Sequence, residues 1–251
     1  ADVRELRKRF PGVPVVSYVN TTADVKAESD ACCTSSNAAA VIDSFETDTV
    51  IFLPDEYLAA NVARETGRRI IFPTRDGKES EARSTKPPAL PGDNDEGTII
   101  GWPGRCEVHE KFTVQDVRDV RTQFPDVTVL AHPECPPDVV LASDFSGSTS
   151  AMIRHVRESK AGRYLLLTEC AMGDNIAAEN PQKEMLRMCS VRCPHMNQIT
   201  LEDTLSAIRE NQYVIDVDRE VADFHFDAGE MFDGQEHGVD RAVALATLVR
   251  R

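Results

Sequence analysis

Short, almost continuously apolar runs alternate along the chain with stretches that have helical spacing of apolar residues. The predicted strands cover residues 13–19, 50–53, 69–72, 98–101, 127–131 and 164–168. The predicted helices lie between them, over residues 23–29, 37–44, 56–66, 114–123, 137–142 and 149–158. Continuously apolar strands that alternate with helices are typical of parallel sheets covered on both faces. We therefore predict an α/β fold.

One stretch interrupts this alternation. Residues 74–97 read TRDGKESEARSTKPPALPGDNDEG, which is charged, rich in Pro and Gly, and nearly devoid of apolar side chains. Such a segment cannot bury enough apolar surface to offset the entropy lost on ordering it. We predict a mobile surface insertion here.

An internal repeat divides the chain. Residues 10–36 match residues 124–150 at a constant offset of 114 (10 to 124), beginning with Phe-Pro-Gly-Val against Phe-Pro-Asp-Val. After the insertion the offset falls to 87, where Cys106 is matched by Cys193 (106 to 193). This self-similarity predicts two homologous α/β units, each ending in a loop that carries one cysteine.

Polar residues follow the first strand of each predicted unit, at the edge where open parallel sheets bind ligands. The repeat aligns Tyr18 with His132, and Asn20 with Glu134. Any one of these residues could simply cap a helix or satisfy loop backbone. His132 and Glu134 are two positions apart and therefore point to one face, which favours a proton-transfer site.

Two hydroxyl-rich runs, Thr34-Ser35-Ser36 and Ser148-Thr149-Ser150, each precede a predicted helix. Ser and Thr at this place commonly only cap the helix. The free N–H groups of a helix N-terminus also bind phosphate or carboxylate, and Gly147 would let a ligand approach the backbone closely. Both interpretations stay open for each run.

Composition narrows the class of protein. The net charge of −14 disfavours nucleic acid and anionic membranes as partners, and it fits either an ordinary solvated surface or a high-salt cytoplasm. No apolar run approaches the ~18–20 residues that span a bilayer, and no export signal opens the chain, so we expect a cytoplasmic protein. The first residue is Ala rather than Met, which suggests a processed product or a fragment.

The seven cysteines are odd in number and irregularly spaced, which argues against a disulfide framework. Most cysteines in such proteins are small buried apolar side chains. Cys106 and Cys193 differ because they are repeat-equivalent, and the Pro after Cys193 is a common context for an iron–sulfur ligand. Two thiolates hold neither a 4Fe-4S cluster nor a structural zinc, so we expect a third ligand on a further unit. A zinc site using Cys189 and Cys193 is the weaker alternative.

Together these features resemble the quinolinate synthase family. The matching stretches span nearly the whole chain and comprise residues 18–22 with 25–27, 33–37, 54–55, 102–110, 131–137, 147–150, 168–169 and 193–196. The resemblance implies three homologous three-layer αβα units around a pseudo-threefold axis, with a 4Fe-4S cluster held by one cysteine from each unit. It also implies condensation of iminoaspartate with dihydroxyacetone phosphate to quinolinate in NAD biosynthesis, and a functional link to the enzyme that produces iminoaspartate.

The same resemblance assigns roles to individual residues. Cys106 and Cys193 would be cluster ligands. Tyr18, His132 and Glu134 would be catalytic, with Glu134 as the candidate general base and Tyr18 as a candidate for proton transfer. The substrate contacts would be Tyr18, Val19, Asn20, Ser35, His132, Pro133, Glu134, Thr149 and Glu169.

In this interpretation residues 1–112 form the family's second unit, residues 113–199 its third, and residues 200–251 a C-terminal helical segment. Nothing in the chain matches the family's first unit, which carries another cluster cysteine and further substrate-binding residues. Two hypotheses follow. The chain is part of a synthase that is active in its complete form, or it is a non-catalytic, cluster-binding fragment that needs a separate first unit.

Overall fold

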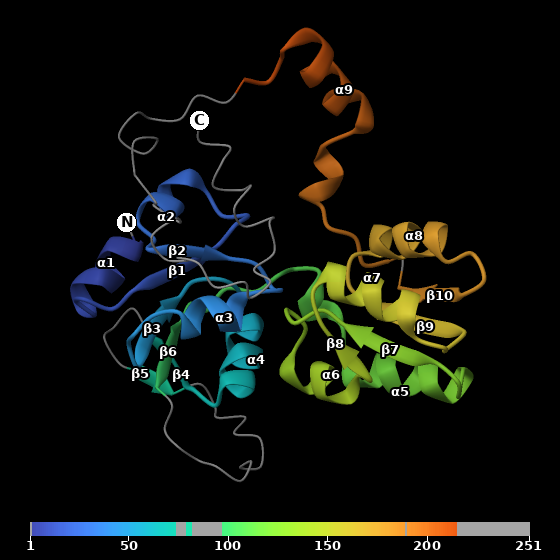
Figure 1. Cartoon of the computed structure of the whole chain (residues 1–251), viewed down its shortest axis with the longest axis horizontal. Helices are drawn as coiled ribbons and strands as arrows, with labels where there is room; N and C mark the ends of the chain where they lie inside the picture. Colours follow the sequence, from blue (N-terminus) through green and yellow to red (C-terminus); the bar gives the residue numbers. More distant parts are fainter. Residues whose placement is uncertain (1, 74–78, 82–96, 189, 215–251) are drawn as a thin grey trace. The chain divides into compact units, whose positions relative to one another are not determined.

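The computed structural model describes residues 2–73, 79–81, 97–188 and 190–214. They form two compact units, the first ending at Arg105 and the second beginning at Cys106. Each unit is built around its own sheet with helices on both faces (Figure 1). The α/β fold predicted from the sequence is confirmed. The predicted insertion at 74–97 lies, except for residues 79–81 and 97, outside the described residues.

The first unit contains a six-stranded sheet with the strand order β2-β1-β3-β6-β4-β5. All neighbours are parallel except the β4–β5 pair, which is antiparallel. The strands are β1 (Val15–Tyr18), β2 (Ala31–Cys33), β3 (Thr49–Phe52), β4 (Arg69–Pro73), β5 (Glu79–Glu81) and β6 (Thr98–Gly101). The helices are α1 (Asp2–Arg9), α2 (Ala23–Ala27), α3 (Ala38–Asp43) and α4 (Glu56–Thr66).

Alternation along the strands of this sheet divides its core into two layers. Val16 of β1 and Phe52 of β3 pack with α3 and α4 on one face. Val15 and Ile51, the neighbouring positions, pack with Leu6 of α1 on the other face. Successive strand side chains point to opposite faces, so strands that are apolar throughout need helices on both sides.

The second unit contains a four-stranded sheet with the order β10-β9-β7-β8, parallel throughout. Its strands are β7 (Thr128–Ala131), β8 (Phe145–Ser146), β9 (Arg163–Leu167) and β10 (Glu184–Arg187). Its helices are α5 (Val114–Gln123), α6 (Pro137–Ala142), α7 (Thr149–Glu158), α8 (Cys170–Glu179) and α9 (Leu201–Glu210), with 3₁₀ turns η1 (His109–Lys111) and η2 (Met196–Gln198). One core layer joins the sheet to α5 and α6, and the other joins it to α7 and α8.

An aspartate that accepts hydrogen bonds from a strand amide and from an arginine occurs in both units, at positions separated by the repeat offset of 114. We call this arrangement the polar anchor. In the first unit Asp30 accepts hydrogen bonds from the Val15 amide at 2.7 Å and from the Arg7 guanidinium at 2.8 Å. In the second unit the corresponding residues are Asp144, Val129 and Arg121, at 2.8 Å for both contacts. The internal repeat inferred from the sequence is therefore also present in the local structure.

The segments that follow Cys106 and Cys193, which the sequence relates by an offset of 87 (106 to 193), also have the same local structure. Cys106 is followed by η1, and Cys193 by η2. A capping box then begins the next helix, formed by Thr113 and Asp116 at α5 and by Thr200 and Asp203 at α9. Both cysteines thus precede the same succession of turn, capping box and helix. None of the helices in the described part of the chain has the length and apolar composition needed to cross a membrane.

Candidate active site

A group of buried, chemically active side chains lies at the carboxyl end of β7 in the second unit. His132 and Glu134 directly follow this strand, whereas His109 comes from η1 and Cys106 from the segment before it. The backbone amide of His132 still donates to the Leu167 carbonyl of β9, which holds the first residue beyond β7 against the sheet. Separate segments thus converge on one strand end, where parallel sheets bind ligands.

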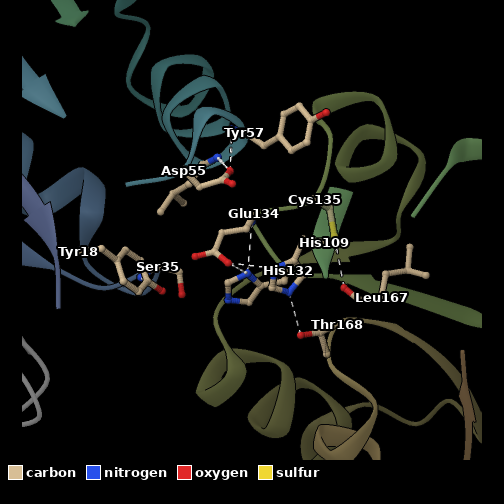
Figure 2. Close-up of polar contacts among 11 residues, drawn as sticks. Tyr18, Ser35, Asp55, Tyr57, His109, His132, Glu134, Cys135, Leu167 and Thr168 are labelled. Carbon is tan, nitrogen blue, oxygen red and sulfur yellow. Dashed lines mark hydrogen bonds and ion pairs between the residues drawn. The ribbon is translucent and has the colours of Figure 1, made fainter. Parts of the chain in front are cut away.

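His109 is held through both of its ring nitrogens. Its Nδ1 atom lies 2.9 Å from Oε2 of Glu134, and its Nε2 atom lies 3.1 Å from Oγ1 of Thr168. Figure 2 shows the His109 ring between these two partners and beside the ring of His132. The two imidazoles are stacked, with centroids 4.5 Å apart and planes inclined by 14°.

The two histidines titrate in opposite directions. Burial by itself would lower the pKa of His109, but hydrogen bonds with Cys106 and Glu134 outweigh it and raise the pKa to about 9. Burial and the neighbouring charge of His109 lower the pKa of His132 to about 4. Near neutral pH the site therefore contains an imidazolium paired with the Glu134 carboxylate, stacked on a neutral imidazole.

The neutral tautomer of His132 follows from its contacts. Its Nδ1 atom accepts a hydrogen bond from the Glu134 amide at 3.3 Å, so in the neutral ring the proton resides on Nε2. The Nδ1 atom also lies 3.7 Å from the Glu134 carboxylate, at the outer limit of an ion pair. His132 can therefore donate a hydrogen bond from Nε2, whereas Glu134 can accept a proton.

Cys106, His109 and Glu134 also form a group able to hold a metal ion. One potential ligand atom from each of these residues lies within 4.8 Å of those of the other two. A thiolate, an imidazole and a carboxylate are all common ligands of first-row transition metals. This group lies entirely within the second unit.

The structure places the remaining sequence-predicted residues of the second unit at helix starts or in the β7 loop. Pro133 lies between His132 and Glu134. Thr149 is the exposed first residue of α7, and the side chain of the preceding Ser148 caps that helix by accepting from the Ala151 amide. Glu169 caps α8, accepting from the Ala171 amide at 2.6 Å. Of the two interpretations left open for the run 148–150, helix capping is therefore observed at Ser148.

In the first unit, Tyr18 and Ser35 are brought together. Tyr18 ends β1, and its hydroxyl accepts a hydrogen bond from the Ser35 amide at 3.3 Å. Val19 follows directly, its amide bonded to the Cys33 carbonyl at 3.0 Å. Asn20 is exposed in the next turn. These four residues therefore gather around the carboxyl ends of the neighbouring strands β1 and β2.

Cys106 and Cys193 are both partly buried and pack against the same core layer of the second unit. Each sulfur has a polar neighbour, since a ring nitrogen of His109 lies within 4.8 Å of Sγ of Cys106 and the Met196 amide nitrogen lies 3.5 Å from Sγ of Cys193. The remaining described cysteines differ. Cys33, Cys135 and Cys170 are buried, and Cys32 is partly buried with its sulfur 3.4 Å from the Ser17 hydroxyl. Cys189 lies outside the described residues.

Two residues of this site received no role from the sequence, His109 and Thr168. Both fall within stretches that matched the family, but nothing in the local pattern connects them to Glu134. The Cys-x-x-His spacing of Cys106 and His109 was an available signal, because this spacing is common in metal sites. The contact of His109 with Thr168 spans 59 positions and depends on tertiary structure.

Comparison with known proteins gives consistent results. The family model described as "Quinolinate synthetase A protein" matches residues 1–228. "Quinolinate synthase 2" of Mesorhizobium japonicum is 48% identical over 221 residues, which are 88% of this chain and 59% of the relative. "Quinolinate synthase" of Agrobacterium fabrum is 47% identical (88% of this chain, 55% of the relative), and that of Caulobacter vibrioides strain NA1000 is 45% identical (89% and 54%).

The chain therefore spans between 54% and 59% of the length of these three relatives. The family match covers both described units and continues past α9. The cysteine loops, the residues after β1 and β7 and the α7 start all fall within it. On this evidence, the chain belongs to the quinolinate synthetase A protein family.

Proposed function

We propose that this chain is part of a quinolinate synthase, which condenses iminoaspartate with dihydroxyacetone phosphate, releasing phosphate and water, in NAD biosynthesis. The observation that carries the proposal is the buried arrangement of Glu134, His109 and His132 beside Cys106. It supplies a proton acceptor, a hydrogen-bond donor and a metal-binding thiol at one strand end. The small-molecule substrates, a link to the enzyme that produces iminoaspartate and a cytoplasmic location belong to the same proposal.

Glu134 is the proposed general base. Its side chain is 12% exposed and pairs with His109, which holds the carboxylate in one orientation. Neutral His132, with its proton on Nε2, is suited to donate a hydrogen bond to a substrate oxygen without adding charge. Glu134 would thus accept the proton, and His132, on the other side of Pro133, would donate the hydrogen bond.

Cys106 and Cys193 are the proposed ligands of a 4Fe-4S cluster. A 4Fe-4S cluster of this family needs three cysteine ligands, and this chain supplies two of them. Both thiols are partly exposed and have polar neighbours, which suits them to bind iron. The repeated turn and capping box after each cysteine give the two loops the same local form. When bound, a cluster with one open iron position supplies a Lewis acid for a substrate oxygen or nitrogen.

The proposed substrate-anion contacts come from two places in the chain. Tyr18, Val19, Asn20 and Ser35 lie around the ends of β1 and β2 in the first unit. In the second unit, Thr149 offers an exposed hydroxyl at the N-terminus of a ten-residue helix, where the helix dipole favours a phosphate or carboxylate. Glu169 belongs to the same proposal, and in this structure its carboxylate caps α8.

A third αβα unit in the complete protein is also part of the proposal. The repeat relates α9 to α5, and α5 to α1. Leu6 of α1 and Val117 of α5 are buried against their own sheets at 7% and 1% exposure. By contrast, α9 leaves a stripe of apolar side chains exposed, consisting of Leu201, Leu205 and Ile208. This stripe would cover the sheet of a further unit in a pseudo-threefold arrangement.

The proposed limits of the units follow the family pattern. Residues 1–112 would be the second family unit, residues 113–199 the third, and residues 200–251 the C-terminal segment that begins with α9. The compact units divide at residues 105 and 106, so the Cys106 loop packs with the residues that follow it.

Anaerobic reconstitution with iron and sulfide tests this function. The chain is prepared alone, and also joined to the part of the Mesorhizobium japonicum relative that it does not cover. We expect the joined protein to retain about four irons and to form quinolinate. A joined protein that retains the cluster without forming quinolinate would support the alternative, a non-catalytic cluster-binding fragment. Failure of both preparations to retain iron would contradict the cluster assignment.

A further inference from the structure

We propose that Asn37 is a positioning residue, which fixes the turn of residues 34–37 so that Ser35 supplies the hydroxyl of this turn that meets the substrate. Asn37 is 8% exposed and lies between β2 and α3. It has no part in the site described above. The inference rests on the proposed function, because that function makes Ser35 a substrate contact.

The side chain of Asn37 bonds back to Thr34 and not forward to the helix that it precedes. Its Oδ1 atom accepts from the Thr34 amide at 2.7 Å and from the Thr34 hydroxyl at 3.0 Å. Asn37 is the N-cap residue of α3, yet its side chain makes no capping hydrogen bond with that helix. The side chain therefore stabilises the turn before α3 and not the start of α3.

The direction of each hydroxyl bond in the turn follows from these contacts. Oδ1 of Asn37 can only accept, so Thr34 donates its single hydroxyl proton to it. The Thr34 oxygen then accepts from the Ser36 hydroxyl at 2.7 Å and from the Ser36 amide at 3.3 Å. The hydroxyl protons of Thr34 and Ser36 are thus both used inside the turn, where they cannot be donated to a ligand.

Ser35 is held in a different way from its two neighbours. Its amide donates to the Tyr18 hydroxyl at 3.3 Å, and Figure 2 shows Ser35 beside Tyr18 at the end of β1. The bonds of the turn thus engage Thr34 and Ser36 through their hydroxyls, but Ser35 through its backbone. Of the three hydroxyls in this run, the turn therefore assigns the substrate contact to Ser35.

The same pair of bonds occurs twice elsewhere in the chain, with aspartate in place of asparagine. Asp116 accepts from the amide and the hydroxyl of Thr113, both at 2.7 Å, and Asp203 accepts from those of Thr200 at 3.0 and 2.6 Å. At both places the threonine is the N-cap of a ten-residue helix. In the turn of residues 34–37 the same bonds lie before the helix, so here they order a connecting segment.

The second atom of the Asn37 amide shows that the side chain acts as an acceptor. Nδ2 is buried and has no hydrogen-bond partner among the residues that the structure describes. The opposite amide orientation would place Nδ2 against the Thr34 amide, which is also a donor. Asn37→Asp would therefore keep the acceptor oxygen and remove no hydrogen bond, whereas Asn37→Ala would remove two.

Amide hydrogen exchange of the full chain tests the positioning directly. We expect Asn37→Ala to speed exchange of the Thr34 and Ser35 amides by roughly 10-fold, because loss of buried hydrogen bonds favours local opening. Asn37→Asp should return exchange to within ~3-fold of the unmodified chain. Asn180→Ala is the matched control, since it removes a buried asparagine of the second unit and should not change exchange in this turn.

Kinetics of the joined protein provide the second measurement. We expect Asn37→Ala to raise KM by roughly 10-fold while kcat changes by less than ~3-fold, because a displaced Ser35 weakens binding of substrate and transition state alike. Ser35→Ala should raise KM similarly, and adding Asn37→Ala to it should have little further effect, since both act through one contact. Ser36→Ala should change KM by less than ~2-fold.

Unchanged exchange in Asn37→Ala would overturn the proposal, and so would an equal rise in KM with and without Ser35. A larger rise in KM for Ser36→Ala than for Ser35→Ala would also overturn it. Circular dichroism checks folding. Should Asn37→Ala not fold, Thr34→Val replaces it, because this variant keeps the amide bond and removes the hydroxyl, and the same dependence on Ser35 is expected.

These outcomes are separable from those of the proposed function. Exchange that responds to Asn37→Ala as expected, in a joined protein that forms no quinolinate, would remove the synthase assignment and leave Asn37 as the residue that fixes the turn. Quinolinate formation that does not depend on Asn37 would remove only the positioning role.

Discussion

His109 and Glu134 form a buried ion pair, with Nδ1 2.9 Å from Oε2 and side chains only 9% and 12% exposed. The two residues are 25 positions apart (109 to 134) and come from a 3₁₀ turn and the loop after β7. The pair fixes the orientation of Glu134, the proposed base, beside the His132 ring that is stacked on His109.

Glu134→Gln should lower quinolinate formation by the joined protein by about 10²–10⁴-fold, because the amide cannot accept the proton. The cluster absorbance should be retained, because Glu134 is not a proposed cluster ligand. The measurement is turnover alongside the visible spectrum of the same preparation. Glu110→Gln is the matched control, since Glu110 is exposed in the neighbouring turn. Full activity of Glu134→Gln would remove this residue from the mechanism.

Cys106→Ser and Cys193→Ser should each abolish the cluster absorbance after reconstitution, since a serine hydroxyl is a poor substitute for a thiolate on iron. Cys32→Ser should leave the absorbance unchanged, because Cys32 is not repeat-equivalent to either proposed ligand. Iron content per chain provides a second measurement. Loss of the cluster in Cys32→Ser alone would show that the ligand assignment is incorrect.

The stability of the metal-free chain should have a maximum near pH 6–7. The pKa of His109 is raised from 6.5 to about 9. The stability that its partners confer is therefore fully present below the unfolded-state pKa and is lost as the pH rises through about 9. The pKa of His132 is lowered to about 4, so the unfolded chain binds more protons between pH 4 and 6.5 and stability falls as the pH drops through this range.

Chemical denaturation across this pH range gives the measurement. His109→Gln should flatten the alkaline side of the profile and His132→Gln the acidic side, each by an amount of the order of 2–3 kcal/mol. His195→Gln is the control, because the His195 side chain is 78% exposed. An alkaline side that stays unchanged in His109→Gln would contradict the assigned protonation of the pair.

Asp30→Asn and Asp144→Asn should each destabilise the chain by about 1–2 kcal/mol, and by similar amounts. Each aspartate accepts a strand amide and an arginine, and the amide replacement weakens the charge-assisted bonds. The free energy of unfolding in urea is the measurement. Asp119→Asn, on the exposed face of α5, should have little effect. A large effect at only one of the two aspartates would show that the two polar anchors do not contribute equally to stability.

Much of the fold could be predicted from local signals. The helices at Glu56–Thr66, Val114–Gln123, Pro137–Ala142 and Thr149–Glu158 have the predicted bounds. Their starts are marked locally, by side-chain caps at three of them and by Pro137 at the first position of α6. All six predicted strands begin and end within two residues of the observed limits, and β6 (Thr98–Gly101) coincides with its prediction.

Other elements gave no local signal. β2, with the sequence Ala-Cys-Cys, is a strand because it pairs in parallel with β1, and β10 likewise depends on β9. β8 has only two residues and pairs with β7. α8 contains Gly173, a weak helix former, yet its start is stabilised by the Glu169 cap and its Ile176 is buried against the sheet.

By itself the sequence determined the α/β alternation, the repeat and the choice of His132, Glu134, Cys106 and Cys193 as candidate residues. These features are local or periodic, so they can be recognised from spacing along the chain. Only the tertiary structure brought His109 and Thr168 to Glu134, because parallel strands require long connections that carry sequence-distant segments to the same sheet edge. The protonation of the two histidines was decided there as well, since a pKa depends on burial and on neighbouring charges that exist only once the chain has folded.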